Sequence, residues 1–168
     1  SESKFDSVQR SQASFTASEQ RGFQIFLSET GDCFHCHSDG SSNTFTDKLF
    51  RNNGLDSVPV GGSFTDNGRG DITGNADDNG HFRDMTLRNI ALTGPYMHDG
   101  RFATLADVVH FYSEGEKMSP TVDAFMLKPN HANGGLHLSA SDQQALIDFL
   151  NTLTDTKFTT NPAFSDPF

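Results

Sequence analysis

The chain has 168 residues and a formal net charge of −10 at pH 7. Its length suits one domain with a core of its own, and its charge argues against nucleic acid as a partner, because phosphate contacts need clustered Lys and Arg. No apolar run approaches the length that a transmembrane helix requires. With 16 Phe, no Trp and 15 Gly, we expect a small aromatic core wrapped by long irregular loops.

The first predicted helix begins after Thr16. Thr16 and Glu19 have the spacing of a capping box, and Phe23, Phe26 and Leu27 share one helical face. The pattern predicts a helix of about three turns.

Directly after this helix, residues 33–37 read Cys-Phe-His-Cys-His and include the only two cysteines of the chain. C-x-x-C-H is typical of c-type haem attachment, in which each thiol adds across a haem vinyl group and the following histidine ligates iron. We therefore predict one covalent haem c on Cys33 and Cys36, with His37 as the proximal iron ligand.

Other interpretations of this motif explain it less well. A structural zinc site would need a second ligand pair at finger spacing, but there is no further cysteine, and the next histidine, His81, lies too far along the chain. A thioredoxin-type pair belongs in an alternating pattern of strands and helices, which this sequence lacks. A lone disulfide would leave His37 unexplained.

Residues 38–83 are rich in turn chemistry, including Asn-Asn-Gly at 52–54. A structureless loop of this length is unusual in a compact domain unless it is draped over a cofactor. Residues 75–80 suggest a calcium loop, but Asn75 would stand at its first position and Thr86 at the twelfth, where a bidentate Glu is needed. We reject the calcium interpretation.

Two more amphipathic helices are predicted in the second half of the chain. One begins at Thr104, with Asp107 three residues on. Its apolar positions are Leu105, Val108, Val109 and Tyr112. The other begins near Ser139, and its apolar positions have the same spacing: Leu146, Phe149, Leu150 and Leu153.

The two ends of the chain, residues 1–15 and 155–168, are polar with scattered Phe. We expect them to pack as extended arms or to fray. The order of helix, C-x-x-C-H, loops and final amphipathic helix predicts a mainly α, cytochrome c-like domain.

Residues 86–102 read Thr-Leu-Arg-Asn-Ile-Ala-Leu-Thr-Gly-Pro-Tyr-Met-His-Asp-Gly-Arg-Phe. Together with the haem motif, this stretch resembles the C-terminal haem domain of bacterial di-haem cytochrome c peroxidases, and more closely their MauG-like branch. Further matches are Ser-Lys-Phe-Asp at 3–6, Phe-Thr-Asp at 45–47, and Thr-Leu at 104–105 leading to Phe-Tyr at 111–112. The resemblance covers nearly the whole chain and implies long irregular loops around one covalent haem.

The family carries two haem domains, and its peroxide-reacting haem belongs to the N-terminal one. This chain has a single C-x-x-C-H motif. We therefore expect residues 1–168 to form a single cytochrome c domain that resembles the C-terminal half of a di-haem peroxidase, either as a fragment or as a stand-alone descendant, with the N-terminal haem domain absent. Haem attachment of this kind takes place outside the bacterial cytoplasm, so the motif implies an exported, periplasmic protein.

The sixth iron position decides between electron transfer and reaction with small molecules. Its candidate ligands are Met97, Tyr112, Met118 and Met126. The resemblance favours Tyr112, because the peroxidases proper have a ligating methionine at that place after His98, and the MauG-like branch has a ligating tyrosine. Met97 and Met118 remain alternatives, and Tyr112 could instead be a core aromatic with its hydroxyl hydrogen-bonded.

The resemblance implies further roles around the haem. Arg88 could pair with a haem propionate or form a surface salt bridge, and His98 is a possible polar neighbour of the haem edge. The family's inter-domain calcium takes backbone carbonyls at positions matching Thr93 and Pro95, but its remaining protein ligand lies in the missing domain, so calcium is doubtful. The other histidines form no constellation that predicts a site, and His35, between the cysteines, is expected to face outwards: His35, His81, His110, His131 and His137.

These observations predict an electron-transfer domain. Its six-coordinate haem would accept electrons from a small donor and relay them to the peroxidatic haem of an N-terminal haem domain or partner redox protein. Catalysis by the isolated chain is not expected, since a peroxidase needs an open iron position and a distal acid–base group. The alternatives are a self-sufficient single-haem peroxidase or ligand-binding haem sensor, and a partner-binding fragment whose haem is structural.

Overall fold

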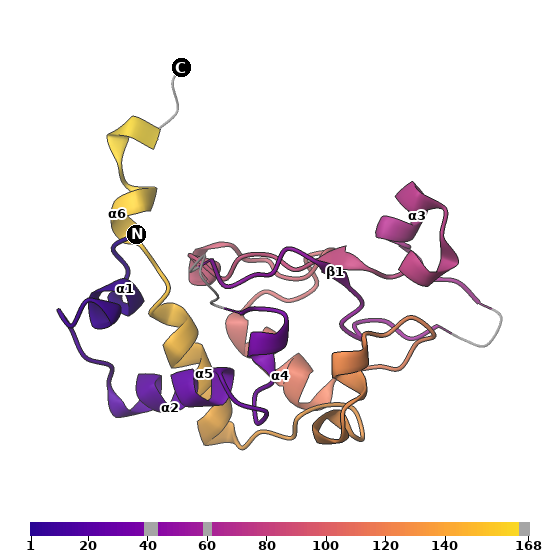
Figure 1. Ribbon diagram of the computed structural model, residues 1–168, viewed down its shortest axis with the longest axis horizontal. Helices are drawn as coiled ribbons and strands as arrows, with labels where there is room; N and C mark the ends of the chain where they lie inside the picture. Colours follow the sequence, from indigo (N-terminus) through magenta and orange to yellow (C-terminus); the bar gives the residue numbers. More distant parts are fainter. Residues whose placement is uncertain (39–43, 59–61, 165–168) are drawn as a thin grey trace.

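The computed structural model describes residues 1–38, 44–58 and 62–164 (Figure 1). These residues are mainly helical, as predicted, and their only sheet has two short strands. The helices are α1 (Lys4–Gln9), α2 (Ala17–Phe26), α3 (Arg69–Thr73), α4 (Leu105–Glu114), α5 (Ala140–Asn151) and α6 (Thr156–Thr159), and the strands are β1 (Phe50–Arg51) and β2 (Phe82–Arg83). No helix among the described residues is long and apolar enough to cross a membrane.

The three predicted helices begin at their predicted caps. The Thr16 side chain accepts a hydrogen bond from the backbone of Glu19 at the start of α2, and Thr104 does the same with Asp107 at the start of α4. Both capping boxes are complete, since the acidic side chain also accepts from the backbone N–H of the cap. Ser139 caps α5.

The buried face of α2 differs from the predicted one at its end. The helix stops at Phe26, so Leu27 is its C-cap and is 40% exposed. Ile25 is buried in its place. Leu27 was predicted to share a helical face with Phe23 and Phe26, but it lies past the last helical residue.

The prediction of an extended or frayed arm at residues 1–15 is wrong. Ser3 and Asp6 form a capping box that starts α1, and Phe5 is only 1% exposed. Its ring contacts Phe45 and Phe149 at centroid distances of 5.0 and 6.2 Å. The short helix is stable here because it inserts this ring into the core of the domain.

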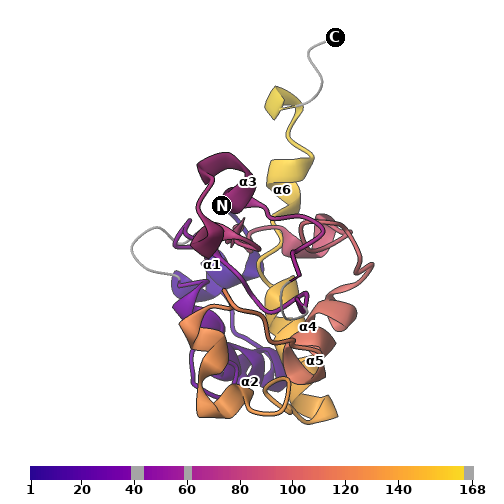
Figure 2. The ribbon, with the colours of Figure 1, turned by 90° about the vertical axis from the view of Figure 1, so that its right-hand side faces the viewer.

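The opposite end of the chain extends from the body. Helix α6 and the residues that follow project away from the other helices in both views (Figures 1 and 2). Phe158 and Phe164 are 54% and 65% exposed, and their rings contact each other at 5.1 Å. This segment forms short helical turns where an extended arm was one expectation, and residues 165–168 lie outside the described part.

The predicted long loop at 38–83 contains regular structure. Strand β1 pairs antiparallel with β2 at the end of this segment, with Phe50 opposite Arg83 and Arg51 opposite Phe82. Helix α3 lies between the two strands in sequence. The expectation of a structureless loop is therefore corrected for the residues described, which exclude 39–43 and 59–61.

The core forms where α2 and α5 cross, and α4 packs on α5 as well. Gly22 of α2 lies directly against the backbone of Ala145, and a Cβ atom at Gly22 would approach the Cβ of Phe149 to 2.8 Å. Phe149 is fully buried. This close crossing fixes the end of α2, and with it the start of the C-x-x-C-H segment.

Candidate haem site

The haem motif forms one turn of 3-10 helix, Cys33–His35, that begins a few residues after α2. The backbone N–H of His37 donates to the Cys33 carbonyl at 2.9 Å, which closes the turn. Both cysteines are free thiols. Burial raises the pKa of Cys33 and of Cys36 to about 12, so both are protonated at neutral pH. Two reduced thiols on one turn fit covalent attachment of a haem.

His37 is oriented by a hydrogen bond to the backbone. Its Nδ1 lies 3.1 Å from the carbonyl oxygen of Phe45, which is buried and has a left-handed φ of 54°. A carbonyl only accepts, so Nδ1 carries the proton and Nε2 presents a lone pair. Burial lowers the pKa of His37 and favours this neutral form. The imidazole therefore fits the role of an iron ligand through Nε2.

Tyr112 lies on α4 with its hydroxyl directed at the loop after β1. The Oη atom accepts a hydrogen bond from Nδ2 of Asn53 at 3.0 Å. Burial raises the pKa of Tyr112, and the hydrogen bond from Asn53 opposes this shift. The Tyr112 hydroxyl is thus held by the Asn53 amide.

Met97 reaches the same amide group. Its Sδ atom lies 3.7 Å from Nδ2 of Asn53. Met97 has a left-handed φ of 70° and stands in a turn closed by the backbone pairing of Tyr96 with Phe102. Two of the predicted distal-ligand candidates, Tyr112 and Met97, are therefore brought together at one side chain.

The other two candidate methionines lie in a different cleft. Met118 is 63% exposed, and it lines a cleft of about 550 Å³ together with Met126 and Leu127. Neither sulfur has a contact with Asn53 among the described hydrogen bonds. Met118 and Met126 are therefore not brought to Asn53, and the identity of the second iron ligand stays a prediction.

A charged cluster next to Cys36 was missed by the sequence analysis. Arg51 is 9% exposed at its side chain and pairs with Asp47 at 2.5 Å, with Asp123 at 3.5 Å and with Asp84. Burial raises the pKa of Asp84 to about 6, although Arg51 opposes the shift. Only the i, i+4 spacing of Asp47 and Arg51 could have been noticed in sequence, because the strand pairing brings Asp84 to them.

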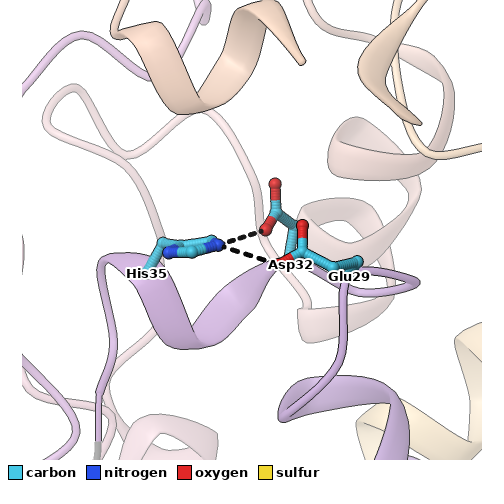
Figure 3. A group of neighbouring side chains, drawn as sticks. All are labelled: Glu29, Asp32 and His35. Atoms are coloured by element: carbon cyan, nitrogen blue, oxygen red, sulfur yellow. Dashed lines mark hydrogen bonds and ion pairs between the residues drawn. The ribbon is translucent and has the colours of Figure 1, made fainter. Parts of the chain in front are cut away.

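His35 takes part in a second polar cluster (Figure 3). Its Nε2 faces Glu29 and Asp32, each at 3.2 Å, and its ring stacks on Phe125 at 4.4 Å. The His35 side chain is 23% exposed and pairs with the 62% exposed side chain of Glu29, so the expectation that it faces outwards stays a prediction. The possible ligand atoms of Glu29, Asp32 and His35 lie within 4.8 Å of one another, as in a cation site. However, the ammonium of Lys128 already pairs with both carboxylates.

The same cluster contains a buried histidine. His131 lies between Asp32, at 2.9 Å from its Nε2, and Glu116, at 2.8 Å from its Nδ1. All three side chains are nearly inaccessible, with exposed fractions of 4%, 2% and 6% for His131, Asp32 and Glu116. This bridge connects the residue before Cys33 to the segment that follows α4.

Comparisons with known proteins place this geometry in a family. The chain is 31% identical over 185 residues to the methylamine utilization protein MauG of Paracoccus denitrificans, a match that covers 94% of the chain and 47% of MauG. It is also 31% identical over 170 residues to the cytochrome-c peroxidase IdrP1 of Denitromonas iodatirespirans, covering 86% of the chain and 42% of the relative. No family model matches.

The solved structures agree. A MauG-like protein associated with microbial copper homeostasis superposes with a TM-score of 0.80 at 37% identity, over 98% of this chain and 51% of that one. The chain belongs to the MauG and di-haem cytochrome c peroxidase family. The diheme peroxidase BthA of Burkholderia thailandensis, at 24% identity and a TM-score of 0.73, has the same fold. The chain spans about half the length of these relatives.

Within this family member, Arg88 is engaged in the fold. Its guanidinium donates to both carboxylate oxygens of Asp6 at 3.0 Å and to Ser3 Oγ at 3.2 Å. It also lies over the rings of Phe5 and Phe45, at 5.4 and 5.3 Å. These contacts correspond to the salt-bridge interpretation of Arg88, and pairing with a propionate stays a prediction.

His98, in the His-Asp-Gly turn of this MauG relative, is exposed and stacks on Phe82. The two ring centroids are 3.6 Å apart and the planes differ by 6°. Both residues line a small cleft with Asn53. His98 is therefore near the Asn53 end of the site, where a neighbour of the haem edge was predicted.

Proposed function

We propose that this chain is a c-type haem electron-transfer domain that relays electrons to the peroxidatic haem of a di-haem cytochrome c peroxidase or MauG-like protein. The observation that carries the proposal is the position of the Tyr112 oxygen. Nδ2 of Asn53 donates a hydrogen bond to it at 3.0 Å. A tyrosine oxygen held in this way is a suitable second protein ligand.

The residues divide the work of binding the cofactor. Cys33 and Cys36 provide the two thiols for attachment, and His37 offers Nε2 because Nδ1 is committed to the Phe45 carbonyl. Tyr112 supplies the opposite ligand. The bound haem supplies one-electron chemistry, and its potential depends on the axial ligands and their surroundings.

A pair of protein ligands favours electron transfer over catalysis. With both axial positions taken by side chains, peroxide has no position at the iron, whereas a peroxidase requires an open one. A phenolate oxygen is a hard anionic ligand, so it favours the ferric state and lowers the potential relative to a thioether. The negatively charged cluster of Arg51 with Asp47, Asp84 and Asp123 acts in the same direction.

The partner is proposed from the comparisons. The relatives are about twice as long as the matched region, and we place the peroxidatic haem in the part that this chain does not cover, with this domain as the C-terminal half. The location is periplasmic, as c-type attachment requires. Calcium binding through Thr93 and Pro95 stays doubtful for this chain alone.

The first experiment tests whether the iron has a coordination position free for an added ligand. The ferric holoprotein is titrated with cyanide and with hydrogen peroxide while its absorption spectrum is recorded. We expect a low-spin spectrum that neither compound changes. A high-spin spectrum with rapid ligand binding would overturn the electron-transfer proposal and support a self-sufficient peroxidase or a haem sensor.

Substitution of the ligand tests the axial assignment. Tyr112→Phe removes the anionic oxygen, so it should change the ferric spectrum and raise the reduction potential by on the order of 0.1 V, a fraction of the range that axial ligands control. Met97→Leu, the matched control at the other side chain that contacts Asn53, should change little. If Met97→Leu instead abolishes the low-spin signal, Met97 is the ligand and the assignment of Tyr112 is wrong.

A further inference from the structure

Asn53 touches both candidate ligands. Its Nδ2 lies 3.0 Å from the Tyr112 oxygen and 3.7 Å from the Met97 sulfur. An amide nitrogen carries two hydrogens and accepts none, so it can serve both acceptors at once. The oxygen is the better acceptor, because a thioether accepts hydrogen bonds only weakly.

The backbone on either side of Asn53 is fixed. The carbonyl of Asn52 accepts from the N–H of Asp123 at 2.9 Å, and the carbonyl of Gly54 accepts from Lys117 at 2.7 Å. Gly54 has a left-handed φ of 74°, and a Cβ there would come within 2.9 Å of the Lys117 oxygen. Asn53 is therefore anchored on both sides to the segment after α4.

The neighbouring side chain strengthens this anchor. Nδ2 of Asn52 donates to Ser119 at 2.9 Å and to Thr121 at 3.1 Å, and its Oδ1 accepts from the N–H of Gly54 at 3.0 Å. Asn52 is buried, with 2% of its surface exposed. The Asn-Asn-Gly string, which reads as a flexible turn in sequence, is thus a rigid mount for the Asn53 amide.

We propose that Asn53 is the positioning residue that selects the sixth iron ligand: its amide holds the Tyr112 oxygen in place for iron and retains the Met97 sulfur beside it as the excluded alternative. The inference rests on the proposed axial role of Tyr112. A donor aimed at the oxygen favours its ligating form, which has lone pairs to share. The same donor gains little from a thioether, so the choice between the ligands depends on it.

The test compares two substitutions of Asn53 in the ferric holoprotein. Asn53→Asp keeps the shape of the side chain but removes the donor, so a purely structural role would be preserved. We expect the ratio of tyrosinate-ligated to other forms, measured from the tyrosinate-to-iron charge-transfer band and electron paramagnetic resonance, to fall on the order of tenfold. Asn53→Gln, which keeps the amide donor, should retain more of the tyrosinate signal.

Two controls isolate the effect of the donor. Asn151→Asp adds the same charge at an exposed position of α5 and should leave the spectrum unchanged. In a Tyr112→Phe background, Asn53→Asp should change the spectrum less than it does in the wild-type chain, because the oxygen that accepts from the Asn53 donor is gone. The combination Asn53→Asp with Met97→Leu should lose any methionine-type low-spin signal that Asn53→Asp alone has gained.

The outcomes separate this inference from the proposed function. If Tyr112→Phe changes the spectrum but Asn53→Asp and Asn53→Gln both keep the wild-type band and potential, Asn53 has no positioning role and the axial assignment stands. If Tyr112→Phe itself changes nothing, the axial assignment and the role of Asn53 both fail. If Asn53→Asp does not fold with haem, Asn53→Gln alone provides the test. A loss of the tyrosinate-to-iron band in folded Asn53→Gln that equals the loss in Tyr112→Phe would also overturn the role of the donor.

Discussion

Single residues tie the haem motif to the rest of the chain, and His131 is a clear case. Burial alone lowers the pKa of His131, but the hydrogen bonds and charges of Glu116 and Asp32 outweigh it, so the pKa is raised above the usual value of 6.5. As an imidazolium the ring donates to both carboxylates at once. When it is neutral, one nitrogen can no longer donate, and one buried carboxylate loses its partner.

We therefore expect His131→Leu to lower the free energy of unfolding by about 3 kcal/mol at pH 6, because the buried carboxylate of Glu116 loses its cation. Asp32 keeps its pair with Lys128 at 2.7 Å. The stabilisation from a raised histidine pKa is fully present below about pH 6.5 and is lost as the pH rises through the folded-state pKa. Urea unfolding of the holoprotein at pH 6 and pH 9 should show a smaller difference at pH 9.

The matched control for His131 is His137. It pairs with Glu114 at 2.9 Å, but the two side chains are 48% and 41% exposed, so His137→Leu should cost less than about 1 kcal/mol. Equal losses for the two substitutions, or a difference that grows with pH, would contradict the role given to His131.

At the scale of elements, the domain depends on the crossing of α2 with α5. Gly22 allows the two backbones to meet, since a side chain there would collide with Ala145 and Phe149. The crossing positions the end of α2, and the haem turn Cys33–His35 follows shortly after it. A change at the crossing should therefore be transmitted to the motif.

Intrinsic helix propensity and packing predict opposite effects of Gly22→Ala on the free energy of unfolding. Gly→Ala in an exposed helix interior gains about 1 kcal/mol, whereas overpacking a close contact costs about 1–3 kcal/mol. We expect Gly22→Ala to lower the free energy of unfolding by about 2 kcal/mol, measured by urea denaturation of the holoprotein. Gln20→Ala, on the exposed side of α2, should stay within about 0.5 kcal/mol. A more stable Gly22→Ala variant would show that the helices can separate at no cost.

The whole molecule is defined by its charge as much as by its fold. A formal charge of −10 gives the surface a negative field that attracts a basic electron donor and speeds its encounter. Salt screens this attraction, with a Debye length of about 10 Å at 0.1 M.

The second-order rate of haem reduction by a small basic redox protein should therefore fall on the order of tenfold between 10 mM and 200 mM salt. Stopped-flow absorbance of the haem gives this rate directly. An uncharged small-molecule reductant serves as the control and should show little dependence on salt. A rate that rises with salt would contradict this prediction, because it would show that the basic donor meets a positively charged face.

Local features of this protein could be predicted from the sequence. The starts of α2, α4 and α5 were found correctly, because a cap and the spacing of apolar residues act within a few positions of the chain. The haem turn was equally visible, since two thiols and a histidine on one short segment determine the attachment chemistry. The family followed from residues 86–102 read with this motif.

What only the tertiary structure decided are the contacts between distant segments. Asn53 meets Tyr112 across 59 positions, and Arg51 meets Asp84 through the pairing of β1 with β2. No short-range spacing encodes such contacts, because they depend on how the chain closes around its core. The sequence by itself therefore predicted the cofactor, haem c, and its proximal ligand, His37. The tertiary structure brought Tyr112 and Met97 to the amide group of Asn53. These contacts could not be predicted from the sequence, because only folding places these three side chains together.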